Sequence, residues 1–274
     1  MGAAASRDVL DAMLALRICR RRYALATVIE TRGSTSATNG SKAVIDADGH
    51  VLAGWVGGGC AESTVCHSAI ACLRSGESAI VDIDLTSEVL GTGMPCGGSM
   101  RVYVEPVQPR PRLWILGHGK VAEVLCAVGV IAGFDVTVDD PMADCERYPA
   151  ATQLFADDLD YRQLEPGAGD YVVVATQHKG DHQSMIRCLR SPVRYIALIA
   201  SRKRSRLVLD YLRKQGFGES DLARVRAPAG LDLGAKTPEE IALSVLSEII
   251  MLRRKADGVP RSQKTSLMEN QTCS

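Results

Sequence analysis

The sequence has no net charge, few aromatic residues and no apolar run long enough to cross a membrane. Its 274 residues include 32 Lys and Arg against 32 Asp and Glu, so no general field attracts nucleic acid or an anionic membrane. Aromatic residues make up only 4%, which also disfavours a surface that stacks on bases. A transmembrane helix needs about 20 consecutive apolar residues. We therefore expect no nucleic acid among the partners and no membrane span.

Cysteine pairs of the kind that hold zinc or build disulfide frameworks are also missing. The nine cysteines are an odd number, none forms a CxxC pair, and no secretory signal precedes them. This usage is typical of reduced thiols in the cytoplasm. His178 and His182 are four residues apart, but Gly180 between them disfavours a zinc site. Five cysteines lie in apolar segments with a helical pattern and are expected to be small buried side chains: Cys19, Cys66, Cys72, Cys126 and Cys188.

The residues that are present divide the chain into two regions. Apolar residues make up 46%, enough for sizeable cores, and the segment "PVQPRPR" (106–112) has the proline content of a linker. The region 1–108 mixes helical and strand patterns and is predicted to be a mixed α+β domain. Its expected elements are helices at 7–20 and 61–75, strands at 23–30, 78–85 and 99–106, and a hairpin at 42–56 that turns at Asp48-Gly49.

The region 113–255 alternates short apolar strands with helical stretches. Continuous apolar strands of this kind are typical of a parallel sheet covered on both faces, so the fold class is α/β with a Rossmann-like, doubly wound second domain. Its last helix begins with a capping box of Thr237, Pro238 and Glu240. The wide apolar face of that helix favours burial against the first domain or another subunit, which suggests a homodimer. The polar tail 256–274 is predicted to be disordered.

The segment "ILGHGKVA" places Gly117-x-Gly119-x-x-Ala122 directly between a strand and a helix. Glycines there let the backbone approach a phosphate, and the helix N-terminus offers unpaired N–H groups. Asp139 ends the next strand, at the spacing from which an acid accepts ribose hydroxyls. We expect a nucleotide at this turn, and Asp139 argues against a 2′-phosphate. The alternative is that the glycines only allow close packing of strand and helix.

Two other cysteines stand in glycine-rich loops rather than in helices. Cys60 follows Gly57, Gly58 and Gly59, and Cys96 precedes Gly97 and Gly98. A thiol at a helix start is stabilised as the thiolate by the helix dipole, and successive glycine N–H groups can bind an anion. Thiolates are soft ligands that suit metals or carry sulfur. We therefore predict that Cys60 and Cys96 bind a cofactor, with a metal contact through sulfur, rather than fill gaps in a core.

These motifs, with "VVVATQHKGDH", "RYIALIASRKR" and "GLDLGAKTPEEIA", occur in the order typical of a known family. From about residue 8 to 254 the chain resembles the XdhC/CoxI proteins, which are accessory factors of molybdenum hydroxylases. Its motifs are more similar to those of the CoxI branch. The resemblance implies a chaperone without turnover of its own. Such a protein binds molybdenum cofactor in its molybdopterin form, shields it while a cysteine desulfurase adds sulfur, and delivers it to the hydroxylase apoenzyme.

The resemblance also assigns residues. Cys60 and Cys96 match the two loop cysteines of the family, and the residues at 117, 119 and 122 match its Rossmann turn. One departure concerns the loop 33–42, where Ala37 stands in place of a basic residue that many members have. If that basic residue contacts the cofactor's phosphate, Lys42 is the replacement that the sequence offers.

Two alternatives stay open. The first is an NAD-dependent oxidoreductase that uses the Rossmann turn, with His118 or His178 as the proton donor. The second is a redox sensor in which Cys60 and Cys96 form a reversible disulfide. Nothing in the sequence marks a substrate site for hydride transfer, and only the separation of the two sulfurs would decide the second alternative.

Overall fold

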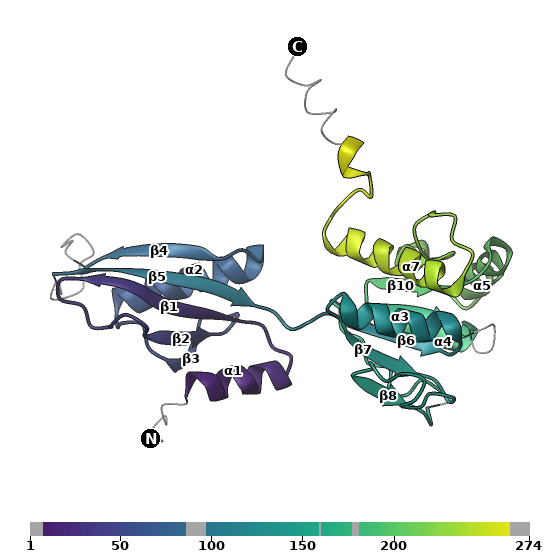
Figure 1. Cartoon of the computed structure of the whole chain (residues 1–274), viewed down its shortest axis with the longest axis horizontal. Coiled ribbons are helices and arrows are strands. Elements are labelled where there is room, and N and C mark those ends of the chain that lie inside the picture. Colours follow the sequence, from purple (N-terminus) through teal and green to yellow (C-terminus); the bar gives the residue numbers. More distant parts are fainter. Residues whose placement is uncertain (1–7, 86–96, 159, 177–180, 264–274) are drawn as a thin grey trace, which may run out of the picture. The chain divides into compact units, whose positions relative to one another are not determined.

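The computed structural model describes residues 8–85, 97–158, 160–176 and 181–263 (Figure 1). The chain divides into two compact units between Pro109 and Arg110, within the segment predicted to be a linker. The linker itself is shorter than its prolines suggest. Pro106 still lies in a strand and pairs with Ala24 of the neighbouring strand.

The first unit is a five-stranded antiparallel sheet with a helix on each face. The strands are ordered β3-β2-β1-β5-β4, and every pair in this sheet is antiparallel. The predicted hairpin at Asp48-Gly49 forms between β2 and β3, and Gly76 ends the second helix in the left-handed conformation. The elements are α1 (Val9–Ile18), β1 (Tyr23–Arg32), β2 (Lys42–Ile45), β3 (Val51–Gly54), α2 (Cys60–Ser75), β4 (Ala79–Asp84) and β5 (Ser99–Val107).

Side chains alternate between the two faces of this sheet and pack into two separate cores. The larger core lies under α2, where Val65 and Ala69 pack with Val28 and Val102 of the central strands. On the opposite face, α1 buries its predicted stripe through Leu16. A second apolar stripe on α1 stays exposed, formed by Leu10, Leu14 and Ile18. Cys19, expected to be buried, is also exposed, because α1 ends at Ile18 and Cys19 is its C-cap.

The second unit confirms the predicted α/β fold. All strand pairs in its six-stranded sheet are parallel, in the order β11-β10-β9-β6-β7-β8. Three short elements are not predicted by the sequence, namely β8, α6 and β11, because two to four residues are too few for a periodic pattern. The elements are β6 (Arg112–Gly117), α3 (Lys120–Ile131), β7 (Asp135–Asp139), β8 (Gln153–Phe155), β9 (Tyr171–Ala175), α4 (Asp181–Arg190), β10 (Tyr195–Leu198), α5 (Arg202–Lys214), α6 (Glu219–Leu222), β11 (Val225–Arg226) and α7 (Pro238–Arg253).

Helices cover both faces of this sheet, as the fold class requires. One core contains residues of α3 and α7, which lie side by side (Figure 1), and the other contains residues of α4 and α5. The capping box of α7 is confirmed, with Thr237 accepting from the Glu240 amide and Glu240 accepting from the Thr237 amide. The buried side of α7 packs on its own unit through Val245 and Ile249, so that side needs no second domain or subunit.

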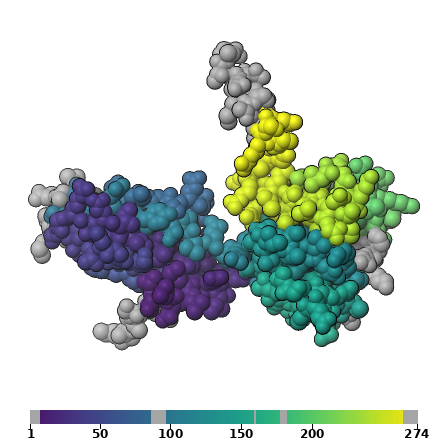
Figure 2. Space-filling view, in the orientation of Figure 1, coloured from purple at the N-terminus to yellow at the C-terminus, as the bar shows by residue number. Residues whose placement is uncertain are grey.

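Figure 2 shows the described residues after α7 in yellow. Residues 256–263 of the predicted disordered tail are described, with helical backbone at 261–263. The remainder of that tail lies outside the described residues. Among the described helices, none is long and apolar enough to cross a membrane.

Candidate functional site

The loop before Cys60 contains three glycines, and the fold requires glycine at only some of these positions. Gly57 has φ +108°, and a Cβ there would lie 3.2 Å from the Ala61 Cβ and 3.4 Å from the Ser36 Oγ. The fold therefore requires glycine at position 57. Gly58 has ordinary φ, and among the described residues nothing lies within 4 Å of a Cβ at Gly58 or at Gly59, although Gly59 has φ +60°. Packing gives no reason for glycine at position 58.

Cys60 is the first residue of α2, and its side chain is exposed and reduced. Gly59 is the N-cap and has no side chain to accept from the first-turn amides of α2. The Thr64 hydroxyl donates to the Cys60 carbonyl at 2.9 Å, which closes the first turn. The thiol therefore stands at the positive end of a 16-residue helix, outside the core, as the sequence predicts.

The second glycine pair packs backbone to backbone against the turn that follows β1. A Cβ on Gly98 would lie 2.5 Å from the carbonyl oxygens of Arg32 and Ser34, and one on Gly33 would lie 2.9 Å from the Gly97 oxygen. Only residues without side chains allow this approach. At Gly97 no described residue lies within 4 Å of an added Cβ, so the described part of the chain leaves this side open.

The turn 33–36 thus connects the two predicted glycine loops. Ser34 touches Gly98 and Ser36 touches Gly57, so both loops lie at the same end of the sheet of the first unit. Cys96 lies outside the described residues, and the separation of the two sulfurs stays untested. The sequence does not single out these serines, since a polar loop gives no signal of what it touches.

Charged side chains around this end of the sheet form a further feature that sequence reasoning missed. They line a groove of about 350 Å³ that includes Arg32, Ser99 and Arg101. The guanidiniums are already paired, Arg32 with Glu30 at 2.7 Å and Arg101 with Asp82 at 2.7 Å. Alternating charges on strands indicate only a solvent-facing side, so the sequence could not separate a groove from an ordinary surface.

The departure at Ala37 has a structural correlate. Ala37 is buried among the residues under α2, so position 37 does not face a ligand in this chain. The ammonium group of Lys42 donates to the Thr27 hydroxyl at 2.9 Å. Whether Lys42 contacts a phosphate stays a prediction.

The glycine turn of the second unit has the geometry that phosphate binding requires. Gly117 has φ +114°, and a Cβ there would lie 2.5 Å from the carbonyl of Ala175, so the turn sits directly against the end of β9. Gly119 is the N-cap of α3, at φ +96° and without a side-chain cap. Ala122 is fully buried, which brings α3 close to the sheet. The same geometry also serves strand–helix packing alone, and nucleotide binding stays a prediction.

Asp139 lies at the predicted strand end but does not reach the surface. Its side chain is 0% exposed, and neither carboxylate oxygen has a hydrogen-bond partner among the described residues. Burial, together with the charges of Asp158 and Asp140, raises the pKa of Asp139 to about 7. An acid that accepts ribose hydroxyls must reach the ligand, so this geometry does not favour the predicted role.

His118, between the two glycines, makes a contact that the sequence leaves undecided. Its Nδ1 lies 2.8 Å from an Asp140 carboxylate oxygen, and the other oxygen of Asp140 accepts from the Met142 amide at 2.6 Å. His118 is therefore a fixed part of the turn rather than a mere spacer. His178, the other candidate proton donor, lies outside the described residues.

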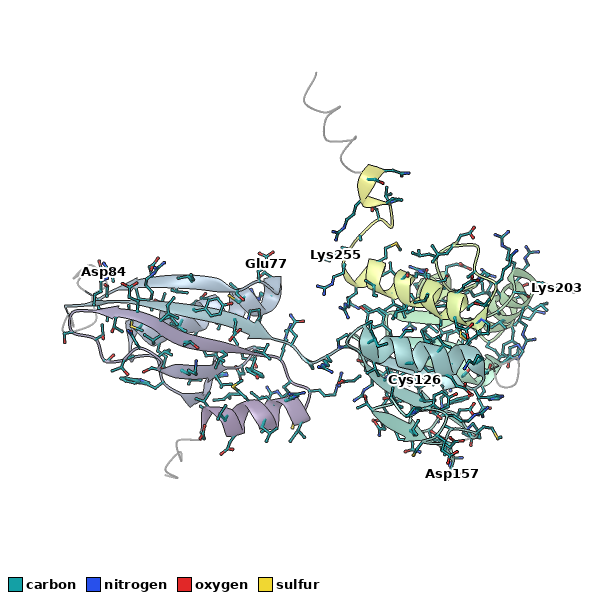
Figure 3. The ribbon with its side chains drawn as sticks, in the orientation of Figure 1. Glu77, Asp84, Cys126, Asp157, Lys203 and Lys255 are labelled. Atoms are coloured by element: carbon teal, nitrogen blue, oxygen red, sulfur yellow. The ribbon has the colours of Figure 1, made fainter. Side chains whose placement is uncertain are left out.

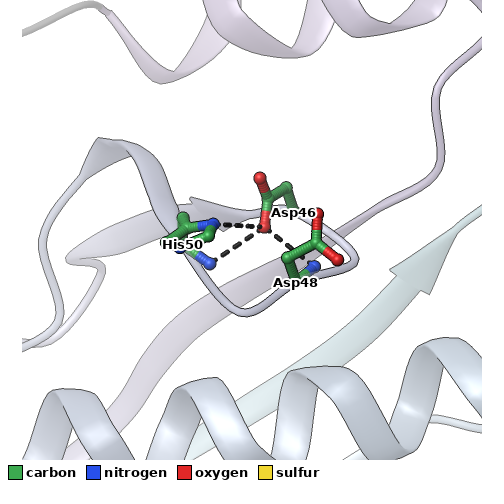
Figure 4. A group of neighbouring side chains, drawn as sticks. All are labelled: Asp46, Asp48 and His50. Atoms are coloured by element: carbon green, nitrogen blue, oxygen red, sulfur yellow. Dashed lines mark hydrogen bonds and ion pairs between the residues drawn. The ribbon is translucent and has the colours of Figure 1, made fainter.

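One cluster in the described residues has the composition of a metal site, at the β2–β3 turn (Figure 4). Asp46 accepts from the amides of Asp48 and His50, at 3.0 and 2.9 Å, and lies 3.5 Å from the His50 ring nitrogen. Burial alone would raise the pKa of Asp46, but the two amides and the His50 ring together outweigh it and hold the pKa below its ordinary value. These bonds close the predicted hairpin turn.

Comparison with known proteins assigns the family. A model of the XdhC Rossmann domain matches residues 113–249, and one of the XdhC and CoxI family matches residues 19–84. The chain belongs to the XdhC and CoxI family. The matched segments fall in the second and the first unit respectively, so the predicted resemblance is confirmed in both.

Three curated relatives illustrate the family's range. The uncharacterized protein YqeB of Escherichia coli K12 is 30% identical over 245 residues, covering 86% of this chain and 44% of that protein. A protein of Bacillus subtilis described as a probable xanthine dehydrogenase subunit is 32% identical over 161 residues, 56% of this chain and 46% of that protein. The molybdenum cofactor insertion chaperone PaoD of E. coli K12 is 21% identical over 281 residues, 84% of this chain and 83% of PaoD.

The chain therefore spans less than half the length of the first two relatives and most of the length of the third. Activities that depend on the whole of those longer proteins do not transfer by similarity alone.

Proposed function

We propose that this chain is a maturation factor that binds molybdenum cofactor and delivers it to a molybdenum hydroxylase. Family membership and the likeness to a protein named a molybdenum cofactor insertion chaperone support this role. The observation that carries the proposal is the exposed Cys60 thiol, beside glycines that packing does not require. It is an accessory role, without turnover of its own.

The residues present fit such a cofactor chemically. Molybdenum cofactor presents soft sulfur around its metal and an anionic phosphate on its pterin tail. A Cys60 thiolate complements the first, and the N-terminal end of α2, where Gly59 has no capping side chain, complements the second. The open space at Gly58, Gly59 and Gly97 leaves room for a ligand where larger side chains would fill it. When bound, the cofactor supplies the metal centre that the hydroxylase later uses.

Finer steps extend the same proposal. Cys60 and Cys96 together hold the cofactor while a cysteine desulfurase adds sulfur, and Gly97 and Gly98 shape the second loop. Gly117, Gly119 and Ala122 form a separate nucleotide site. Delivery takes place in the cytoplasm, from a homodimer.

Substitution of Cys60 tests the proposal directly. The protein is co-expressed with the cofactor pathway, and molybdenum is measured by elemental analysis and pterin by fluorescence after acid oxidation. We expect Cys60→Ser to retain at least about fivefold less of both, because the hydroxyl is a poor thiolate substitute. Cys19→Ser, which changes another exposed thiol of the same unit, is the control and should match wild type. Equal cofactor content in wild type and Cys60→Ser would contradict the role of the thiol.

Glycine substitutions separate binding from folding. Gly58→Ala adds a methyl group into open space at ordinary φ, so the melting temperature should stay within about 1 °C while cofactor content drops. Gly117→Ala forces a Cβ against Ala175 at positive φ and should destabilise the second unit by about 3 kcal/mol. If Gly58→Ala leaves cofactor content unchanged, the open space beside Cys60 is not a binding surface.

A further inference from the structure

The outward face of α5 carries cations that make no ion pair within the described part of the chain. Four of these cations are exposed: Arg202, Lys203, Arg206 and Lys214. None of their side chains makes a hydrogen bond or ion pair with the described residues. Figure 3 labels Lys203 at the outer edge of the second unit, and α5 lies in the green part of Figure 2. Since the whole chain has no net charge, this is a local concentration of positive charge.

This arrangement opposes the stability of the helix that carries it. The first turn of α5 contains no acidic residue, so Arg202, Lys203 and Arg204 stand at the positive end of the helix dipole. Arg202 and Arg206 are also like charges four residues apart. Both effects weaken the helix, most strongly at low salt. A helix selected only for stability and solubility would carry acids at these positions, as the first turn of α7 does with Glu239 and Glu240.

The outward face of α5 also contains an exposed apolar residue, and its residues form a ridge along the helix. Leu207 is 54% exposed and lies one turn after Lys203 on the same ridge, which continues to Lys214. At 1.5 Å per residue the stripe from Lys203 to Lys214 is about 16 Å long. The inward side of α5 is fixed on the sheet through Val208 and Leu212, so the outward side is presented on a rigid element.

We propose that the outward face of α5 is the docking surface for an acidic surface of the hydroxylase apoenzyme. This inference rests on the proposed function and adds the site of partner recognition to it. Cations that are spread along a stripe around a single apolar contact fit a protein partner, where charge sets orientation and association rate.

Other anionic partners fit the face less well. Nucleic acid would meet the carboxylates of Asp210 and Glu219, which pair with Arg213 at 3.1 and 3.0 Å beside the stripe. The aromatic residue of α5, Tyr211, packs against His182 of α4 with the rings tilted by 46° and their centroids 4.1 Å apart, so it is not available to bases. A membrane surface favours several apolar side chains along one face, and this face offers Leu207.

Charge reversal tests the proposal in the full chain. The variant carries Lys203→Glu, Arg206→Glu and Lys214→Glu, and the probe is a purified xanthine dehydrogenase apoenzyme made in a cofactor-deficient host. Binding is measured by biolayer interferometry at about 50 and about 300 mM NaCl. We expect the variant to associate at least about tenfold more slowly at low salt, and wild-type association to slow similarly at high salt. The matched control, with Arg21→Glu, Arg22→Glu and Arg254→Glu, has the same charge change on other exposed sites and should bind like wild type.

The outcomes separate this inference from the proposed function. The α5 variant should keep wild-type molybdenum content and stay folded, because its substitutions lie on an exposed face. Its melting temperature should not fall, since Lys203→Glu puts an acid at the helix start and Arg206→Glu removes a like-charge pair. If wild type binds the apoenzyme and the α5 variant binds equally well, the docking surface is wrong and the maturation role stands. If wild type holds no cofactor and does not bind the apoenzyme, both fail. Stronger α5-dependent binding of a poly-dT strand of about 20 nucleotides or of phosphatidylglycerol vesicles would also overturn the inference.

Discussion

At the residue scale, Asp139 is the side chain whose environment differs most from expectation. Its position at the end of β7 follows from the strand pattern, but its burial depends on the residues that cover it. Asp158 is near enough for its charge to raise the pKa of Asp139, and it is itself 5% exposed and fixed by the amides of Arg162 and Gln163. No sequence pattern predicts that a carboxylate about 20 residues later will act on Asp139, so position along the strand is not enough to infer ribose binding.

The buried acid gives a pH-dependent prediction. The pKa of Asp139 is about 7 in the folded chain, against an ordinary value of 3.8. Below about pH 4 the carboxyl is protonated in both states and does not weaken the fold. As the pH rises to about 7, only the unfolded chain releases the proton, so stability falls, by at most about 4 kcal/mol. Asp139→Asn should therefore stabilise the second unit at about pH 8 and match wild type near pH 4, measured by urea unfolding.

The exposed residue Asp157 provides the control for this measurement. Asp157→Asn should change stability by less than about 0.5 kcal/mol at both pH values, because an exposed carboxylate is solvated in both states. A stability difference between wild type and Asp139→Asn that is the same at about pH 4.5 and about pH 8 would contradict the raised pKa of Asp139.

At the element scale, α7 is the helix whose start the sequence predicts best. Thr237, Pro238 and Glu240 set that start through local hydrogen bonds, and these bonds are present. The amides of Lys236 and Thr237 hold the pKa of Glu240 below its ordinary value, so the capping contribution is present at neutral pH and is lost as the pH falls through that pKa.

Removing the cap gives the element-scale prediction. Thr237→Ala should destabilise the second unit by about 1 kcal/mol at neutral pH, because the Glu240 amide loses its acceptor. Thermal unfolding followed by far-UV circular dichroism would detect the change. Glu239→Ala, in the same turn but outside the box, should cost only a few tenths of a kcal/mol. Equal effects of the two variants would mean that the box does not stabilise α7.

α1 shows the opposite case: its helical period is predicted, but the sequence does not decide which of its sides is buried. Two apolar stripes run along this helix, and periodicity alone does not tell which of them faces the sheet. The stripe with Leu16 is buried on the sheet, whereas Leu10, Leu14 and Ile18 are 70%, 58% and 73% exposed. Which stripe faces inward depends on the side from which β2 and β3 approach, and that is a tertiary choice.

At the scale of the whole molecule, the described cores of the two units share no residue. Val102 belongs to the core under α2, and Val173 belongs to the core under α3 and α7. Each unit also contains one of the two tryptophans, Trp55 in the first and Trp114 in the second. Each unit therefore has its own fluorescent reporter, a half-exposed Trp55 in the first and a buried Trp114 in the second.

Core substitutions test whether the units unfold separately. Val102→Ala should lower the stability reported by Trp55 by about 2 kcal/mol and leave that reported by Trp114 unchanged, and Val173→Ala should do the reverse. Urea unfolding with each tryptophan replaced in turn by Phe measures the two transitions. A single transition that moves with either substitution would show that the units unfold as one.

Local rules in the sequence are enough to predict the fold class of each region and the loops that hold Cys60 and the Gly117 turn. They suffice because strand runs, helix periods, caps and glycine turns are set by neighbours in the chain. Only the three-dimensional arrangement shows which glycines are required by contact, that the turn 33–36 connects the two glycine loops, that Asp139 is buried and that α5 presents its cations outward. Each of these depends on contacts between residues far apart in sequence, and local patterns carry no information about such contacts.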